Sequence, residues 1–123
     1  MVHGNLEIIV IEAKNLKSSL TDKTDPYVSL TIGGKKQKTT TKSNAGKQAD
    51  FNEKFQFDIF DGVQELYLEV WDEDTGKDDL RGSKVIDLQT VFDKKTQDAS
   101  FSLTHKDKHA GDVKLVMYFT PRK

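Results

Sequence analysis

Short segments in which apolar and polar residues alternate recur along the whole chain. In VKLVMYF (113–119) every second side chain is apolar, and ELYLEVW (65–71) repeats the pattern. In an extended strand this period of two places one row of side chains against a core and the other row in water. The feature therefore restricts the chain to a fold built of strands packed on one face.

Eight segments carry this alternation or a fully apolar form of it. The expected strands are 6–13, 27–32, 35–42, 51–59, 65–71, 83–88, 99–103 and 113–119. LEIIVIEA (6–13) is apolar on both faces, which predicts a buried central strand. Turn signals such as Gly33-Gly34 separate neighbouring segments. We therefore predict an all-β fold, an eight-stranded antiparallel β-sandwich.

One short helix is expected near 87–93, between the last strands. Asp87 can cap its first turn, since a carboxylate accepts hydrogen bonds from free backbone N–H groups. The apolar residues behind it follow helical spacing and are Leu88, Val91 and Phe92. This spacing predicts that one side of the helix packs on the core.

The length of 123 residues suits a single domain, 1–123, because a chain of this size buries about two-thirds of its unfolded surface. No cysteine is present, which excludes disulfides, thiolate metal sites and a cysteine nucleophile. No apolar run approaches the length of a membrane span, and the first residues do not resemble a secretory signal. These features predict a cytoplasmic location.

The net charge of −1 hides a strong local sorting of charge. Residues 35–49 contain five lysines and no acid, whereas residues 72–79 contain five acids and one lysine. Such sorting creates local electrostatic fields that the net charge does not report.

The acids gather in two expected loops, one after the first strand and one after the fifth. They are Asp22 and Asp25 in the first loop, and Asp72, Asp74, Asp78 and Asp79 in the second. If the loops share one end of the sandwich, each pair of charges 4 Å apart repels by about 1 kcal/mol in water and about 4 kcal/mol at an effective dielectric of 20. Calcium would remove that penalty, because it binds 6–8 oxygen ligands in flexible geometry.

Other kinds of site fit the residues less well. An EF-hand loop starting at Asp72 would place Lys77 at the glycine position and Ser83 at the glutamate position. His105 and His109 have no third zinc ligand beside them. The chain has no nucleophile motif, P-loop or dinucleotide turn, so we expect no enzyme.

Five segments, in this order and spacing, resemble the C2 domain family: LEIIVIEAKNL, DPYVSL, DFNEKFQF, VWDEDTGKDDLRG and GDVKLVMYF. The combination of DPYV with D-x-D-x(4)-D-x-x-G is specific. The start MVHGNLEI and the end VKLVMYFTP are similar to the small single-C2-domain proteins of plants, of the elicitor-responsive and phloem type. The resemblance implies type II topology, in which the final strand takes the place of the other topology's first strand.

The resemblance also implies a calcium site. The implied ligands are the carboxylates of Asp25, Asp72, Asp74 and Asp79 and the backbone carbonyl of Glu73. The second loop is one residue shorter than the commonest form, so Asp78 is an alternative to Asp79. Leu20 stands where the family has its first aspartate, and Asp22 lies nearby but off register. Loss of that carboxylate predicts fewer ions and weaker affinity.

The lysines of segment 35–42 predict contact with lipid. On a strand, Lys36, Lys38 and Lys42 share one face, and the resemblance makes this the strand that contacts phosphoinositide headgroups. Each lysine near an anionic bilayer contributes about 1 kcal/mol. Lysines on an edge strand also serve simply as a solvated face that blocks aggregation.

These features predict a module that binds anionic phospholipid membranes, containing phosphatidylserine or phosphoinositide, in a calcium-dependent and reversible manner. The alternative is a calcium-independent C2 module for protein interaction or constitutive lipid binding. Leu20 favours that alternative, and the intact second loop favours calcium. A hydrolytic enzyme is a distant third hypothesis.

Overall fold

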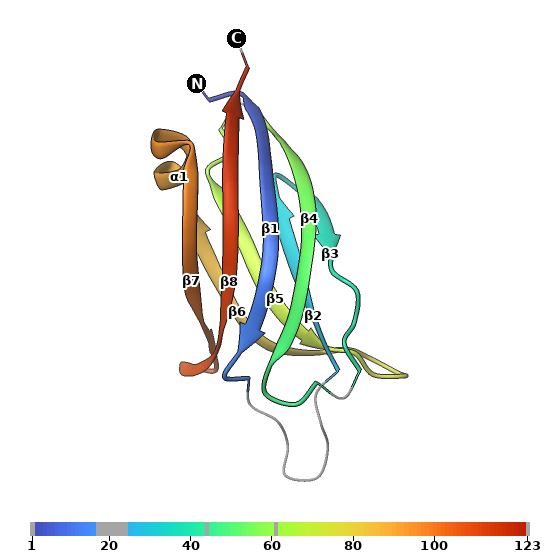
Figure 1. The fold of residues 1–123 in the computed structure, drawn as a ribbon. Coiled ribbons are helices and arrows are strands. Elements are labelled where there is room, and N and C mark those ends of the chain that lie inside the picture. Colours follow the sequence, from blue (N-terminus) through green and yellow to red (C-terminus); the bar gives the residue numbers. More distant parts are fainter. Residues whose placement is uncertain (1, 17–24, 44, 61, 123) are drawn as a thin grey trace.

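The computed structural model describes residues 2–16, 25–43, 45–60 and 62–122 (Figure 1). In these ranges the chain forms eight strands and one helix. They are β1 (Gly4–Lys14), β2 (Pro26–Ile32), β3 (Lys35–Lys38), β4 (Ala49–Ile59), β5 (Glu65–Asp72), β6 (Asp79–Asp87), α1 (Gln89–Lys94), β7 (Thr96–His105) and β8 (Lys108–Pro121). All eight predicted strands are therefore present.

The strands form a nearly closed antiparallel sandwich. Their order is β3-β2-β5-β6-β7-β8-β1-β4. The half from β3 to β6 joins the half from β7 to β4 at a single paired position, Ser83 with Thr104. At the other side Gln37 of β3 donates a side-chain hydrogen bond of 2.7 Å to the Gln56 carbonyl of β4. The last strand lies beside the first, as type II topology predicts.

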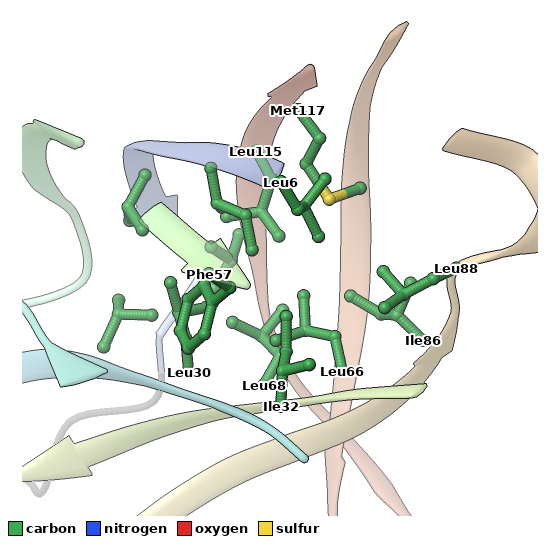
Figure 2. Packing of buried hydrophobic residues seen from close by; sticks show 14 of the residues in the cluster. Leu6, Leu30, Ile32, Phe57, Leu66, Leu68, Ile86, Leu88, Leu115 and Met117 are labelled. Atoms are coloured by element: carbon green, nitrogen blue, oxygen red, sulfur yellow. The ribbon is translucent and has the colours of Figure 1, made fainter. Parts of the chain in front are cut away.

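The core lies between the two halves and is filled by the alternating apolar rows (Figure 2). On β8 these are the fully or almost fully buried Val113, Leu115, Met117 and Phe119. Leu6 of β1 is paired with Phe119, and Ile8 with Met117, so neighbouring strands stack their apolar residues. Burial of such side chains supplies roughly 1.5–3 kcal/mol each.

Helix α1 begins slightly later than the sequence predicts. Leu88, not Asp87, occupies the N-cap position, and it makes no side-chain capping bond. The Asp87 carboxylate instead accepts the backbone N–H of Gln89 at 2.9 Å from one position earlier. The expected apolar side is correct, since Leu88, Val91 and Phe92 are buried.

Strand β3 is shorter than the predicted 35–42. Pairing with β2 ends at Lys38, because the next residue turns inward: Thr39 is buried and its hydroxyl accepts the Val28 N–H at 2.9 Å. The Thr39 N–H returns a bond of 2.9 Å to the Val28 carbonyl. The chain therefore keeps its attachment to β2 through Thr39 but loses the regular alternation beyond it.

The two ends of the described chain lie together at one end of the sandwich (Figure 1). Gly4 of β1 is paired with Pro121 of β8, and the Arg122 N–H donates to the His3 carbonyl at 2.8 Å. The β5–β6 loop and the β7–β8 hairpin lie at the opposite end, which we call the loop end.

Across the residues that the structure describes, no helix is long and apolar enough to cross a membrane.

Candidate functional site

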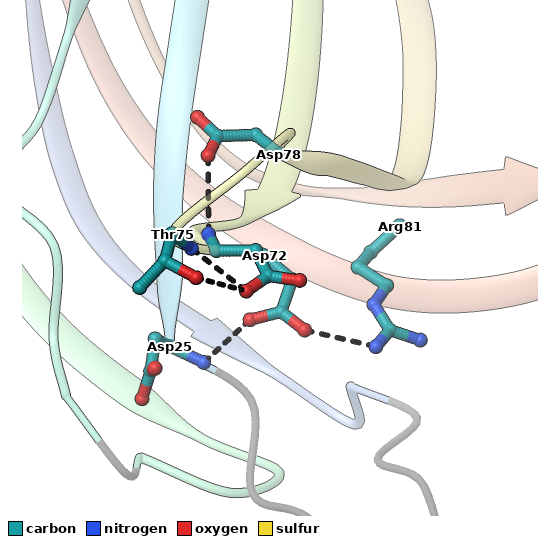
Figure 3. Close-up of polar contacts among 6 residues, drawn as sticks. Asp25, Asp72, Thr75, Asp78 and Arg81 are labelled. Carbon is teal, nitrogen blue, oxygen red and sulfur yellow. Dashed lines mark hydrogen bonds and ion pairs between the residues drawn. The ribbon is translucent and has the colours of Figure 1, made fainter.

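Two acidic segments that are distant in sequence meet at the loop end. Asp25 precedes β2, and Asp72 closes β5. The Asp25 N–H donates to Asp72 Oδ1 at 2.9 Å (Figure 3). The Glu73 N–H donates to the Asp25 carbonyl at 2.9 Å. Pro26 helps this geometry, because the residue before a proline favours an extended backbone. Asp25 and the start of the β5–β6 loop therefore lie at the same end of the sandwich.

An open hollow between these segments is lined by oxygen-bearing residues, and we call it the acidic hollow. Its lining residues are Asp25, Glu73, Asp74, Thr75 and Asp78. Carboxylate and hydroxyl oxygens are the donors that calcium prefers. The residue types therefore suit a hard cation.

Asp72 lies beside the acidic hollow and already has a cationic partner. Arg81 Nη2 donates to Asp72 Oδ2 at 2.9 Å, with the two side chains 33% and 19% exposed. Arg81 reaches Asp72 from a β-bulge: Val70 is paired with Gly82 and Trp71 with Leu80, so Arg81 is the extra residue of β6. Bulges re-aim a side chain in this way.

Asp74 and Asp78 hold the β5–β6 loop together by local hydrogen bonds. The Asp74 N–H donates to Asp78 Oδ1 at 3.1 Å, and the Thr75 N–H donates to Asp74 Oδ1 at 2.7 Å. Such bonds from aspartate to nearby backbone stabilise tight turns. The loop is therefore preformed, although its carboxylates point at its own backbone.

Tyr27 ties the loop to the sheet. Its hydroxyl donates to Asp78 Oδ2 at 2.7 Å. Burial, followed by this hydrogen bond, raises the pKa of Tyr27 to about 12. The same bond, with the Asp74 N–H second, lowers the pKa of Asp78, so Asp78 stays anionic at neutral pH.

Asp79 lies elsewhere. It begins β6, paired with Asp72, and lines a neighbouring depression that Asp78 and Arg81 also line, but it does not line the acidic hollow. Asp78, the alternative considered from loop length, is the one that lines the acidic hollow. Asp22 and Leu20 lie outside the described residues.

The predicted lysine face divides into two parts. Lys36 Nζ lies 5.5 Å from the centroid of the Trp71 ring, and Lys38 Nζ lies 5.0 Å from that of Tyr27. Both ammonium groups therefore make cation–π contacts on the outer face of β2, β3 and β5. Lys42 follows the irregular Thr39 and lies over the buried ring of Phe51, at 5.8 Å, so it does not continue the expected row.

Comparison with known proteins accounts for this arrangement. The family model described as "C2 domain" matches residues 4–103. The chain belongs to the C2 domain family.

Two relatives resemble this C2 domain over almost its whole length. The 16 kDa phloem protein 2 of Arabidopsis thaliana is 30% identical, over 98% of this chain and 84% of the relative. A solved C2 domain-containing protein from an elicitor-responsive gene superposes with a TM-score of 0.87 at 29% identity, covering 99% of this chain and 92% of that chain. The predicted likeness to the plant elicitor-responsive and phloem type is confirmed.

A third relative was solved with calcium. The calcium-bound pair of C2 domains from Extended-Synaptotagmin 2 superposes with a TM-score of 0.82 at 28% identity. The match covers 97% of this chain and 46% of that one. Family membership supports a membrane- or lipid-binding module as the general class of function.

No converged metal centre is found among the described residues of the C2 domain. Among the residues that the structure describes, no three histidine, cysteine or acidic side chains are grouped so that they could hold a metal ion. The reason is visible in the bonds above, since Asp72 is held by Arg81 and Asp78 by Tyr27. Calcium is therefore compatible with the residue types but requires these carboxylates to change partners.

Sequence reasoning missed two residues that govern the acidic hollow of the C2 domain. Arg81 was considered only for its position before Gly82 in the D-x-x-G pattern. A basic residue directly after an acidic run could have indicated an ion pair with one of the aspartates. Tyr27 was treated only as part of a strand. No local pattern indicates its bond to Asp78, which joins positions 51 residues apart.

Proposed function

We propose that the chain is a single C2 module that binds anionic phospholipid membranes with its loop end and that calcium in the acidic hollow promotes this binding. The observation that carries the proposal is the acidic hollow itself, where Asp25 from one loop meets Asp74 and Asp78 from another. Four carboxylates line it, counting Glu73, and their mutual repulsion is relieved by a divalent cation. The module acts by binding rather than by catalysis.

The proposed calcium ligands follow the geometry. Asp25, Asp74 and Asp78 line the acidic hollow, and Asp72 borders it through its bond to the Asp25 N–H. The backbone carbonyl of Glu73 stays a proposed ligand. Asp79 has a weaker claim than the family pattern implies, because it lines a different depression.

Membrane contact then has two electrostatic components. Bound calcium converts the acidic hollow from repelling an anionic surface to attracting it. Lys36 and Lys38 add a permanent basic surface beside Tyr27 and Trp71. Attraction of this type strengthens with anionic lipid and weakens with salt. A cytoplasmic protein of this kind associates with membranes reversibly.

A calcium-independent C2 module is the second candidate, and one observation favours it. The Arg81 guanidinium already neutralises Asp72 at 2.9 Å, so the protein itself supplies part of the positive charge that a metal cation would bring. In that case Lys36 and Lys38 would bind lipid without calcium, or the surface that they form would bind a protein.

Calcium titration followed by calorimetry tests the proposal. We expect millimolar or tighter binding and a rise in melting temperature, because a ligand that binds only the folded state stabilises it. Absence of both heat and thermal stabilisation would refute the calcium claim.

Vesicle sedimentation separates the two candidates. We expect the chain to sediment with phosphatidylserine vesicles in calcium and to be released by a chelator. Equal sedimentation with and without chelator would establish the calcium-independent module, and no sedimentation in either condition would refute membrane binding.

A further inference from the structure

A second hollow at the loop end has the opposite charge, and we call it the basic hollow. It encloses about 250 Å³ and opens to solvent. Its lining residues are Arg81, His105, Lys106, Lys108, His109 and Ala110. Within the described part of the chain, the lining thus contains three permanent cations and two imidazoles, and no carboxylate. The adjoining depression shares Arg81, His105 and Lys106 with this hollow and also contains Asp78 and Asp79.

The backbone builds this hollow through two facing bulges. Arg81 is the extra residue of β6. Ala110 is the extra residue of β8, because Leu103 is paired with Gly111 and Thr104 with His109. A Cβ added at Gly82 would meet Ala110 Cβ at 3.1 Å, so the two bulged strands pack closely behind the hollow. Bulges at such positions re-aim side chains rather than extend the ladder.

The β7–β8 hairpin supplies the remaining cations. Lys106 and Asp107 form its turn with φ of 52° and 65°, the backbone of a two-residue turn of type I′. This tight turn places His105 opposite Lys108 in the ladder. The basic side chains are therefore held by a short, regular hairpin and two bulges rather than by a long loop.

Two side chains of the hollow already have a carboxylate partner, Arg81 in Asp72 and His109 in Asp112. Arg81 Nε is buried and has no partner among the described residues. A buried donor without an acceptor is destabilising. The nearby Asp112 is engaged by His109 at 3.1 Å and by the Asn15 side chain at 2.8 Å, and it does not line the hollow.

We propose that the basic hollow binds a phosphate monoester. Such a group carries close to two negative charges and three strong acceptor oxygens, which suits a guanidinium and two ammonium groups converging from two strands and a hairpin. The ligand is either the phosphorylated headgroup of an inositol lipid or a soluble inositol phosphate. The lining of this site has no residue in common with the acidic hollow or with Lys36 and Lys38, and the site does not require calcium.

The test is an NMR titration of the full chain in the presence of a calcium chelator, with inorganic phosphate and then inositol trisphosphate as probes. We expect the largest amide shifts at 105–110 and at Arg81, with tighter binding of the trisphosphate. K106Q/K108Q should weaken the affinity by about tenfold or more, since it removes two charge-assisted contacts.

The matched control is K84Q/K94Q, which removes the same charge from two exposed lysines away from the hollow. Its affinity should equal that of the unmodified chain. Equal weakening by both double variants, or shifts confined to Lys36 and Lys38, would overturn the proposal. Unchanged melting temperatures show that each variant is folded. H105A/H109A provides a second test, in which the amide shifts on titration should also decrease.

The source of the phosphate is decided with phosphatidylcholine vesicles containing phosphatidylinositol bisphosphate. Sedimentation in chelator that K106Q/K108Q abolishes supports a lipid headgroup. Trisphosphate binding without sedimentation supports a soluble ligand. Failure of the calcium titration leaves this result unaffected, since no step uses calcium.

Discussion

Arg81 shows how one residue can set the state of a site that it does not line. It is placed by a bulge and paired with Asp72 on one side, while it borders the basic hollow on the other. Its guanidinium forms an ion pair with the Asp72 carboxylate, which is one of the proposed calcium ligands. The residue therefore links two regions of opposite charge.

Substitution R81Q should raise the affinity for calcium by about fivefold, because the ion pair that competes with the metal is partly exposed and worth about 1 kcal/mol. The apo protein should be less stable, since Asp72 loses its partner. Calorimetric titration measures the first effect and thermal unfolding the second. K84Q, on the same strand, is the control, and an affinity reduced below that of the control would contradict the competition.

Asp78 and Asp79 form a matched pair for locating the calcium ligand. D78N should weaken calcium binding by about tenfold, because charge count tunes the affinity of such sites. D79N should have little effect, since Asp79, unlike Asp78, does not line the acidic hollow. If D79N weakens binding more, the ligand set implied by the family pattern is correct after all.

Burial of Tyr27, together with its hydrogen bond to Asp78, predicts how stability depends on pH. The pKa of Tyr27 is raised from 10.0 to about 12, so its contribution is complete below pH 10 and is lost as the pH rises through about 12. The pKa of Asp78 is lowered, so its contribution is present above the ordinary carboxyl range and is lost as the pH falls. Y27F should be less stable at neutral pH and should lack this part of the alkaline loss.

Denaturant unfolding of both proteins from neutral pH to about pH 12 measures the difference. The free energies of unfolding of Y27F and of the unmodified chain should converge at alkaline pH. A gap that stays constant across the whole range would mean that Tyr27 contributes by packing alone.

At the scale of elements, alternation predicted every strand but not every boundary. The rows of β5 and β8 follow the sequence closely, because burial of one face requires every second residue to be apolar. Segment 35–42 was extended too far, because threonine is a common strand residue. Its hydroxyl can also replace a backbone partner, and the structure uses this second property at Thr39.

Thr39 therefore makes a testable contribution to the attachment of β3. T39V should lower the free energy of unfolding by about 1–3 kcal/mol, because it leaves the buried Val28 N–H without its acceptor. T39S retains the hydroxyl and should lose much less. Chemical unfolding of both variants measures the difference, and equal losses would assign the effect to side-chain volume.

Bulges explain why the sequence predicted where the site lies but not which aspartates line it. The alternation of side chains assigns residues to the two faces of a sheet only where the pairing between strands is regular. The bulge at Arg81 changes this parity next to the acidic loop, so Asp79 is turned away from the acidic hollow and Asp78 lines it instead. Nothing in the local sequence marks this bulge, and the residue beside it packs tightly: a Cβ added at Gly82 would lie 3.1 Å from the Cβ atoms of Leu103 and Ala110.

For the whole molecule, the separation of charge matters more than the net charge of −1. The acidic and basic hollows have no lining residue in common, but both adjoin one depression that contains Asp78 and Arg81. Lys38 of β3 lies over Tyr27, whose hydroxyl donates to Asp78. K36Q/K38Q should reduce vesicle affinity by about thirtyfold at low salt, at about 1 kcal/mol for each lysine. The reduction should shrink as salt increases.

Vesicle sedimentation across a salt series checks this expectation, with K84Q/K94Q as the control of equal charge. A loss that does not depend on salt would point instead to the cation–π contacts with Trp71 and Tyr27. Melting temperatures of both variants separate that structural effect from lipid binding.

The pairing of Gly4 with Pro121 has a practical consequence for experiments on living cells and surfaces. Both described ends lie opposite the β5–β6 loop and the β7–β8 hairpin (Figure 1). We therefore expect a fluorescent reporter or a surface tether attached to either end to leave the acidic hollow and the basic hollow accessible. A reporter at one end should also be held a full sandwich length from a docked bilayer. Energy transfer between that reporter and a dye in the lipid then reads out which end of the molecule faces the membrane.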